Sequence, residues 1–386
     1  MHTTEAAPLA GHTTLGVGGP AGLLVEVAGA TAEVRAALDA AHAHAERPVT
    51  LLGEGSNVVV SDRGLDAVLL LRGGTVRAVG RTAGGTRVRA DGGMVWDDLV
   101  AWAVAQGLGG IELLSGIPGT VGAAPVQNIA AYGQALADTF VELEAVDRAT
   151  GEVVQLSAAD CAFGYRDSRF KRDWADRFVI TSVTLDLVHE ERSALTYRDL
   201  EVHFERHGGD PWVLADRRAA VLAVRRAKSM VWDPQDALTR SCGSFFMSPF
   251  LPRDEAIALV DAVRGRGAGE RLFAWYSGAE AEDVKVPAAM VLLAAGFANG
   301  DRWGQVGLSP RHVLAIVNLG GATAQRVSDV AAHIQAVVWE QLGVRLHAEP
   351  RFLGEFDPFD ARRFAEEAPY TPGDADTPGW ARDAVR

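Results

Sequence analysis

The sequence has little cysteine: Cys161 and Cys242 are its only thiols among 386 residues. Two cysteines give no disulfide framework, which excludes the small secreted proteins that disulfides stabilise. No apolar run approaches the roughly 20 residues that cross a membrane. The opening stretch, MHTTEAAPLAGHTT, is too polar for the apolar core of a secretory signal. We therefore expect a cytoplasmic protein.

Positive charge is also in deficit. The chain carries 37 Lys and Arg against 50 Asp and Glu, a formal net charge of -13. This balance argues against nucleic acid or an anionic membrane as the main partner. A small anionic ligand remains compatible with it, because local Arg and Lys can outweigh the global field. The length suffices for about two or three domains.

Glycine, in contrast, is concentrated in GIPGTVGAAPVQNIAAYG, from Gly116 to Gly133. We call this segment the second glycine loop, because another glycine loop lies upstream of it. Glycine lets the backbone approach a ligand closely, and proline fixes the turns between glycines. Backbone N–H groups exposed in this way bind phosphate oxygens. The alternative is a Gly/Pro-rich surface loop, which would normally carry more charge and fewer Ile, Val and Ala. The composition favours a ligand-binding loop.

A first glycine loop lies upstream, in LLGEGSN from Leu51 to Asn57. Strand-like residues flank it on both sides, and its Ser and Asn suit phosphate binding by main-chain donors. A strand follows where a Rossmann motif would have a helix, and the GxGxxG spacing is absent. An ordinary hairpin turn explains this stretch equally well.

Hydrophobic periodicity predicts an α+β protein without internal repeats. Alternating or β-branched runs predict strands over 23–28, 49–60, 67–71, 76–90, 141–146, 153–156 and 178–187. Helical spacing predicts helices over 31–45, 97–106, 216–228, 252–263 and 324–342.

The two loops are followed, in order, by FGYRDSRFK, LTYRDL, GSFFMSPF and LHAEPRFLG, at 163–171, 195–200, 243–250 and 346–354. These six blocks together resemble the UDP-N-acetylenolpyruvoylglucosamine reductase (MurB) family, flavoenzymes of peptidoglycan precursor synthesis. The resemblance covers roughly residues 10–354, and blocks in a fixed order are more specific than any single motif.

The resemblance implies an α+β fold, with a two-part FAD-binding domain of the vanillyl-alcohol-oxidase/PCMH type and a smaller α+β substrate-binding domain. It implies FAD-binding subdomain 1 at 1–71 with 344–354, subdomain 2 at 72–227, and the C-terminal substrate-binding domain at 228–343. The tail at 355–386 is acidic, contains prolines and has few aliphatic residues. We expect it to fold little, although its aromatic residues leave a docked tail open.

The implied reaction is the reduction of the enolpyruvyl group of UDP-N-acetylglucosamine enolpyruvate to UDP-N-acetylmuramate. Reducing a double bond conjugated to a carboxylate takes a hydride at one carbon and a proton at the other. No side chain supplies hydride, so a cofactor must. The family uses FAD, reduced by NADPH, with hydride delivered from flavin N5. Because the reaction supplies a peptidoglycan precursor, the resemblance also connects the protein to cell wall biogenesis, cell shape and cell division.

Three residues match the family's catalytic positions. Arg166 would hold the substrate carboxylate, Ser244 would donate the proton, and Glu349 would help polarise the intermediate. Taken singly, the residue types suggest a salt bridge of Arg166 to Asp167, a turn serine, and a carboxylate paired with Arg351. A lone serine is a weak acid, so Ser244 needs a relay or a stabilised alkoxide.

The resemblance also assigns binding residues. Tyr197 and Lys228 match positions that hold the substrate diphosphate, and Tyr197 indicates the subtype with a substrate-covering tyrosine loop; packing and a solvated helix end are the simpler readings. The expected cofactor-binding residues are Gly53, Glu54, Gly55, Ser56, Asn57, Ser115, Ile117, Pro118, Gly119, Thr120, Gly122, Asn128 and Arg351.

The chain departs from the family pattern at substrate positions. Met247 and Ser248 stand where the family usually has a basic or polar residue and Asn, Ala294 stands where it has Gln, and His347 occupies an expected acidic position. Ser248 is kept as a candidate substrate-binding residue. Two alternatives to the family reaction remain. The chain could be a paralogue that reduces another enolpyruvyl or nucleotide-sugar substrate, or a non-catalytic flavin-binding protein.

The remaining partner predictions are simple. His42 and His44 lie two apart on a helix and face different directions, so we expect no metal. The partner would be a small nucleotide sugar. A monomer is favoured, and the sequence does not determine the oligomeric state.

Overall fold

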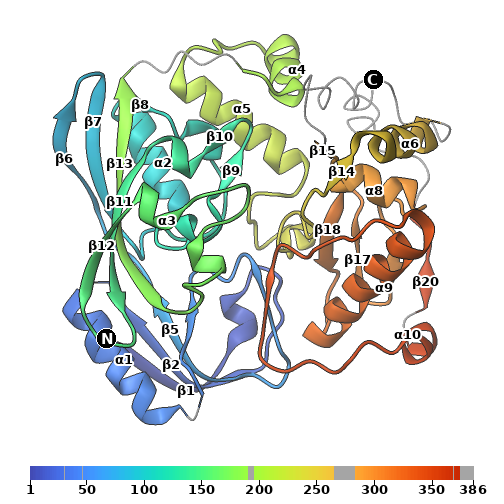
Figure 1. Ribbon diagram of the computed structural model, residues 1–386, viewed down its shortest axis with the longest axis horizontal. Coiled ribbons are helices and arrows are strands. Elements are labelled where there is room, and N and C mark those ends of the chain that lie inside the picture. The colour runs from blue at the N-terminus through green and yellow to red at the C-terminus, as the bar shows by residue number, and fades with distance from the viewer. Residues whose placement is uncertain (30, 46, 190–194, 265–282, 368, 374–386) are drawn as a thin grey trace. The chain divides into compact units, whose positions relative to one another are not determined.

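The computed structural model describes residues 1–386 apart from 30, 46, 190–194, 265–282, 368 and 374–386 (Figure 1). The chain forms two compact units. Unit 1 comprises Met1–Leu9, Pro20–Gly55 and Gly64–Trp232; unit 2 comprises Ala10–Gly19, Ser56–Arg63 and Asp233–Arg386. Among the described helices, none is both long and apolar enough to cross a membrane.

The first sheet of unit 1 has the strand order β1-β2-β5-β3, formed by β1 (His2–Pro8), β2 (Pro20–Val27), β5 (Leu65–Leu71) and β3 (Thr50–Leu52). β1 runs antiparallel to β2, whereas β2 and β3 both run parallel to β5. Helix α1 (Thr31–His44) lies against this sheet (Figure 1). Its Val34, Leu38 and Ala41 are buried in the same core as residues of β2 and β5. The parallel strands need the crossover that α1 provides.

The second sheet of unit 1 has the antiparallel order β12-β11-β13-β7-β6, with β8 (Leu108–Gly109) also paired to β13. Its strands are β12 (Val153–Ser157), β11 (Phe140–Asp147), β13 (Phe178–His189), β7 (Gly85–Asp91) and β6 (Val76–Thr82). Helix α2 (Trp96–Ala105) buries Leu99, Val100 and Ala103 in the same core as Val183 and Leu185. α3 (Ala158–Cys161) is a single turn after β12.

Two further helices complete unit 1. α4 (Arg198–His207) and α5 (Leu214–Ala227) pack together around Leu200, Ala220 and Val221. The second glycine loop runs between α2 and β11. Its end contains β9 (Ala130–Ala131), which forms a short hairpin with β10 (Gln134–Ala135), the strand that follows the loop.

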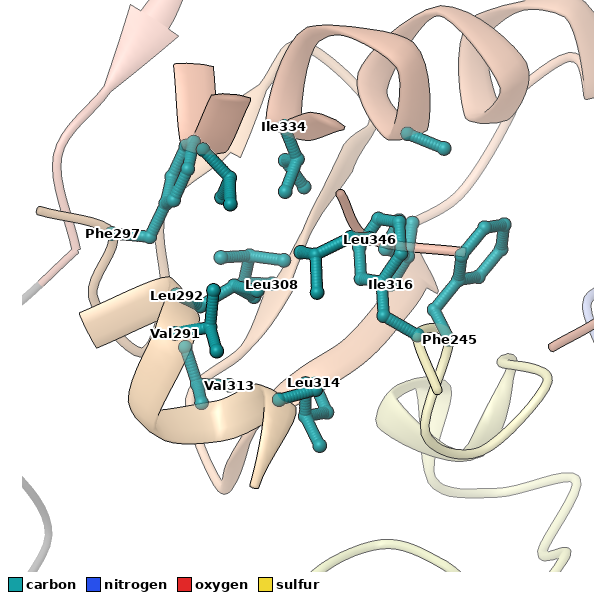
Figure 2. Close-up of a cluster of buried hydrophobic side chains, with 14 of the residues drawn as sticks. Phe245, Val291, Leu292, Phe297, Leu308, Val313, Leu314, Ile316, Ile334 and Leu346 are labelled. Carbon is teal, nitrogen blue, oxygen red and sulfur yellow. The ribbon is translucent and has the colours of Figure 1, made fainter. Parts of the chain in front are cut away.

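Unit 2 contains the sheet β18-β17-β16-β20, formed by β18 (His312–Asn318), β17 (Val306–Ser309), β16 (Arg302–Trp303) and β20 (Tyr370–Thr371). Helices α8 (Ala288–Ala294) and α9 (Ala324–Leu342) share its core, where Phe245, Leu308, Ile316, Ile334 and Leu346 gather (Figure 2). β14 (Phe250–Pro252) leads directly into α6 (Arg253–Arg264) and pairs antiparallel with β15 (Asp283–Lys285). β4 (Val58–Val60) pairs in parallel with β19 (Arg351–Leu353).

The described part of the tail is folded, unlike the prediction for that segment. Phe364 of α10 (Ala361–Glu367) is buried and stacks on His333 with ring centroids 4.9 Å apart. β20 pairs with β16, and the Tyr370 hydroxyl donates a hydrogen bond to Asp301 Oδ1 at 3.1 Å. A few aromatic side chains dock the segment despite its acidic composition. The prediction for 374–386 lies outside the described residues.

The predicted helices are confirmed as α1, α2, α5, α6 and α9, within a few residues at each end. The strand predicted over 49–60, interrupted by the first glycine loop, is confirmed as β3 and β4. These two strands pair with different partners, so the hairpin alternative for this stretch is wrong. β1 and α4 were not predicted. The β1 sequence HTTEAAP contains few apolar residues, whereas RDLEVHFERH is polar on average but places Leu200 and Phe204 at helical spacing, a signal that was overlooked.

Candidate active site

The two glycine loops, distant in sequence, meet in unit 1. The backbone N–H of Gly119 donates a hydrogen bond to Glu54 Oε2 at 2.9 Å. A Cβ on Gly53 would lie 3.2 Å from Thr120 Oγ1 and 3.4 Å from Ala123 Cβ. The absence of a side chain at position 53 therefore lets the first loop approach the second. The remainder of the first loop, Ser56 and Asn57, belongs to unit 2.

The start of the second glycine loop is held by charged side chains. The Gly116 N–H donates to Asp97 Oδ1 at 2.7 Å, and Arg218 donates to both oxygens of Asp97 at 2.6 and 2.7 Å. Burial works to raise the pKa of Asp97, but the hydrogen bonds from Arg218 and Gly116 outweigh it and lower that pKa. The Gly116 carbonyl in turn accepts from Arg225 Nη2 at 3.2 Å.

The middle of the loop packs against backbone. The Gly122 N–H donates to the Gly92 carbonyl at 2.8 Å. A Cβ on Gly122 would lie 2.8 Å from the Ile180 carbonyl oxygen and 3.0 Å from that of Gly92. Glycine is required here because the neighbouring atoms are main chain and cannot move aside.

Some predicted cofactor-binding side chains are engaged with the protein itself. The buried Ser115 hydroxyl donates to the Glu112 carbonyl at 2.6 Å. Asn128, at φ 47, donates through Nδ2 to the Gly164 carbonyl at 3.0 Å and accepts at Oδ1 from the Ala137 N–H at 3.0 Å. These side chains shape the loop, so a ligand would meet mainly its backbone. Small side chains and adjoining main-chain turns fit the phosphates of a dinucleotide.

Arg166 lies in a turn closed by hydrogen bonds between Gly164 and Asp167. Its φ is +52, a strained conformation for a non-glycine residue that only surrounding contacts maintain. Its Nη1 donates to the Ala130 carbonyl of the second glycine loop at 2.9 Å. Asp167 forms its ion pair with Arg172 at 2.9 Å. The turn therefore presents the guanidinium beside the loop.

Cations and tyrosines gather near Arg166 in unit 1. Tyr132 and Tyr197 contact edge to face, with ring centroids 5.5 Å apart, and Lys228 Nζ donates to Asp199 Oδ2. Burial raises the pKa of Tyr132, against the opposing charges of Arg225 and Lys228. Burial lowers the pKa of Arg225, whose charge is also repelled by Arg166. Such a cluster suits an anionic ligand.

Arg225 and Tyr132 were not among the predicted binding residues. Arg225 lies in the last turn of α5, and Lys228 follows the helix three positions later, so both side chains lie near the same side of its C-terminal end. That spacing was the available signal, but the run RRAK also fits a solvated helix end.

In unit 2, Ser244 lies on a segment fixed on two sides. The Phe245 N–H donates to the Leu314 carbonyl of β18 at 2.8 Å, and the Phe245 carbonyl accepts from the Glu349 N–H at 2.9 Å. Ser244 Oγ lies 3.0 Å from His312 Nε2. Ser244 and Glu349 thus lie on neighbouring backbone segments of one hydrogen-bonded layer. His312, which sequence reasoning missed, lies beside Ser244.

The end of the first glycine loop joins the same layer. Asn57 donates through Nδ2 to the Glu349 carbonyl at 3.4 Å, and its own carbonyl accepts from the Arg351 N–H at 3.0 Å. The Cys242 thiol is buried and donates to the Val58 carbonyl at 3.3 Å. Burial raises the pKa of this thiol to about 12, so it is neutral.

Comparisons with known proteins decide the family. Residues 23–157 match the FAD binding domain model, and residues 233–353 match the UDP-N-acetylenolpyruvoylglucosamine reductase C-terminal domain model. The reductase of that name from Thermobifida fusca is 41% identical over 351 residues, covering 90% of this chain and 97% of the relative. This chain belongs to the UDP-N-acetylenolpyruvoylglucosamine reductase family.

Other members of the UDP-N-acetylenolpyruvoylglucosamine reductase family agree. The Mycobacterium tuberculosis protein is 38% identical over 369 residues, covering 92% of this chain and 96% of the relative. The crystal structure of the Thermus caldophilus protein, called MurB, has 25% identity and a TM-score of 0.59 and covers 92% of this chain and 98% of that one. The predicted α+β fold class, an FAD-binding domain of the vanillyl-alcohol-oxidase/PCMH type plus the family's C-terminal domain, is confirmed.

The structure shows the surroundings of two residues that depart from the family pattern, Ser248 and Ala294. Ser248 Oγ accepts a hydrogen bond from the Ala288 N–H at 3.3 Å, at the start of α8. Ala294, near the end of the same helix, is buried in the core of unit 2. The first residue therefore stabilises a helix end, and the second is a small apolar residue of that core.

Proposed function

We propose that this chain reduces the enolpyruvyl group of UDP-N-acetylglucosamine enolpyruvate to UDP-N-acetylmuramate in peptidoglycan precursor synthesis. Its cofactor is FAD and its reductant NADPH. The supporting observation is that backbone hydrogen bonds of Phe245 fix the segment of Ser244 against β18 and against Glu349. The chain also matches a reductase of this name over 90% of its length. FAD, when bound, supplies the hydride.

Arg166 binds the substrate carboxylate in this proposal. Its planar guanidinium can donate two parallel hydrogen bonds to a carboxylate and stabilise the negative charge that develops there. The left-handed turn and the Ala130 contact hold the group in place before substrate arrives. Such preorganisation is what makes an electrostatic contribution large.

Ser244 donates the proton, and Glu349 helps to polarise the intermediate. The donor needs a fixed position, which the hydrogen bonds of Phe245 to β18 and to Glu349 provide. The backbone, the small side chains of both glycine loops, Glu54 and Arg351 hold the cofactor. Tyr197, Lys228 and Ser248 bind the nucleotide sugar, with Tyr197 in a substrate-covering loop.

The domain assignment proposed for this activity has three parts. Residues 1–71 with 344–354 and residues 72–227 form the two FAD-binding subdomains, and residues 228–343 form the substrate-binding domain. The boundary between residues 72–227 and 228–343 falls near Trp232, where the chain passes from unit 1 to unit 2. Residues 10–19, 56–63 and 344–354 of the proposed first subdomain belong to unit 2 as a compact unit.

Replacing Ser244 with Ala tests this function. Reoxidation of the reduced flavin by the enolpyruvyl sugar should fall by about 10²–10⁴-fold, the range for removal of a general acid. Reduction of the flavin by NADPH should be unchanged. Ser157→Ala, at an exposed serine that caps α3, is the control. A loss below about tenfold would exclude Ser244 as the proton donor.

A second candidate is the same chemistry on a different enolpyruvyl or nucleotide-sugar substrate. The engagement of Ser248 with α8 and the burial of Ala294 favour it, because both positions differ from the family pattern. Ser248→Asn restores the family residue. Tighter binding of the UDP-sugar by this variant would support a drifted substrate site; unchanged binding would show that position 248 does not set specificity.

A further inference from the structure

The proton donor of the proposed reaction has an imidazole neighbour. Ser244 Oγ and His312 Nε2 are 3.0 Å apart, which is hydrogen-bonding distance, and both side chains are half-buried in unit 2. The remaining arguments rest on the proposed function, in which Ser244 delivers a proton to carbon.

This pair is held by the fold. His312 is the first residue of β18, and Leu314, two residues later on the strand, accepts the hydrogen bond from the Phe245 N–H. Phe245 is fully buried and lies with Leu314 and Ile316 in the core (Figure 2). One strand therefore supplies the imidazole and also fixes the residue that follows the serine.

A serine hydroxyl is a poor acid near neutral pH, because losing its proton leaves an alkoxide. Histidine is the side chain whose ordinary pKa lies closest to neutrality, so it can carry a proton and give it up under the same conditions. We propose that His312 is a positioning residue and proton relay for Ser244.

The proton steps balance as follows. The Oγ–H bond of Ser244 breaks as a C–H bond forms at the substrate carbon that carries negative charge after hydride addition. The Nε2–H bond of the His312 imidazolium then breaks as the Oγ–H bond re-forms. The neutral imidazole regains its proton from solvent. Before the transfer, the imidazolium donates its hydrogen bond to Oγ and stabilises the charge that develops there.

A purely structural histidine would have the same hydrogen bond. Glutamine can also place an N–H near Oγ but cannot transfer a proton, so His312→Gln separates the two roles. If His312 only orients the hydroxyl, this variant should retain activity. As a relay, it should slow flavin reoxidation by the enolpyruvyl sugar by about 10²-fold, the lower end for proton-transfer groups.

Flavin reduction by NADPH should be unchanged in His312→Gln, since that step does not use the proton of Ser244. The double variant Ser244→Ala/His312→Gln should be no slower than Ser244→Ala alone, because His312 acts through the serine. Free imidazole should restore part of the activity of His312→Ala. His207→Gln, at an exposed histidine of α4, is the control.

A second measurement does not depend on turnover. In protein with ¹⁵N-labelled histidine, the His312 Nε2 resonance is assigned by its loss in His312→Gln. It should move in Ser244→Ala, which removes the hydroxyl partner. This measurement tests the contact between Ser244 and His312 even if the wild-type protein does not reduce the enolpyruvyl sugar. That lack of activity would count against the proposed function and not against the contact.

Three outcomes would each overturn the proposed relay role of His312. They are full activity of His312→Gln, an additional loss of activity in the double variant, and a His312 Nε2 resonance that Ser244→Ala does not move.

Discussion

The carboxylate of Glu54 accepts a hydrogen bond from the backbone N–H of Gly119, 65 residues further along the chain, at 2.9 Å. This bond joins the two glycine loops of unit 1. The loops carry most of the expected cofactor-binding residues, so their alignment determines whether main-chain donors face one ligand.

Replacing Glu54 with Ala should weaken FAD binding. The Gly119 N–H loses a charged acceptor, and such a loss costs about 1.5–3 kcal/mol. If the cost falls on the bound state, the dissociation constant for FAD should rise by about 10- to 100-fold. Titrating the apoprotein with FAD and following the flavin fluorescence measures this dissociation constant. Glu54→Gln, which keeps an acceptor oxygen but not its charge, should weaken FAD binding less than Glu54→Ala does. Equal weakening in both variants would contradict this role.

Gly122→Ala should destabilise unit 1. The new Cβ would lie 2.8 Å from the Ile180 carbonyl oxygen, so backbone must move. Overpacking of this kind costs about 1–3 kcal/mol, measurable as a lower melting temperature. Gly84→Ala, where no atom lies within 4 Å of the new Cβ, is the matched control. Similar melting temperatures for the two variants would show that the loop tolerates a side chain.

The buried ion pair of Glu112 and Arg217 should be strongly coupled. Both side chains are 0% exposed and 3.1 Å apart, and Glu112 also accepts from Gln134 Nε2 and the Gly110 N–H. Arg217→Met leaves a buried charge, which costs about 3–5 kcal/mol. In urea unfolding, Glu112→Gln/Arg217→Met should be more stable than Arg217→Met alone. Additive effects would mean that the pair is not coupled.

Asp97 should make stability depend on pH. Its pKa is lowered in the folded state, so its stabilising contribution is present above the unfolded pKa of about 4 and is lost as pH falls through the folded value. The difference in unfolding free energy between wild type and Asp97→Asn should therefore be constant near neutrality and shrink in acid. A difference that persists at low pH would contradict the ion pair with Arg218.

The sequence predicted the long periodic elements well, because burial of one helix face repeats every few residues. It also identified the glycine loops and the catalytic candidates through ordered motifs. It did not predict that Glu54 joins the loops or that Asp97 and Arg218 hold Gly116, because these contacts depend on tertiary folding. His312 was missed because nothing local connects it with a serine 68 residues away.

The α4 segment was missed because its composition is polar, although Leu200 anchors it. The folded part of the tail was missed because a few aromatic contacts replaced a periodic pattern.

The most direct test of the proposed activity uses the FAD-loaded protein without oxygen. The flavin is reduced with NADPH, UDP-N-acetylglucosamine enolpyruvate is added, and flavin absorbance is followed in the visible range. We predict rapid reoxidation with formation of UDP-N-acetylmuramate. A flavin that NADPH reduces normally but that this substrate does not reoxidise would contradict the proposed activity.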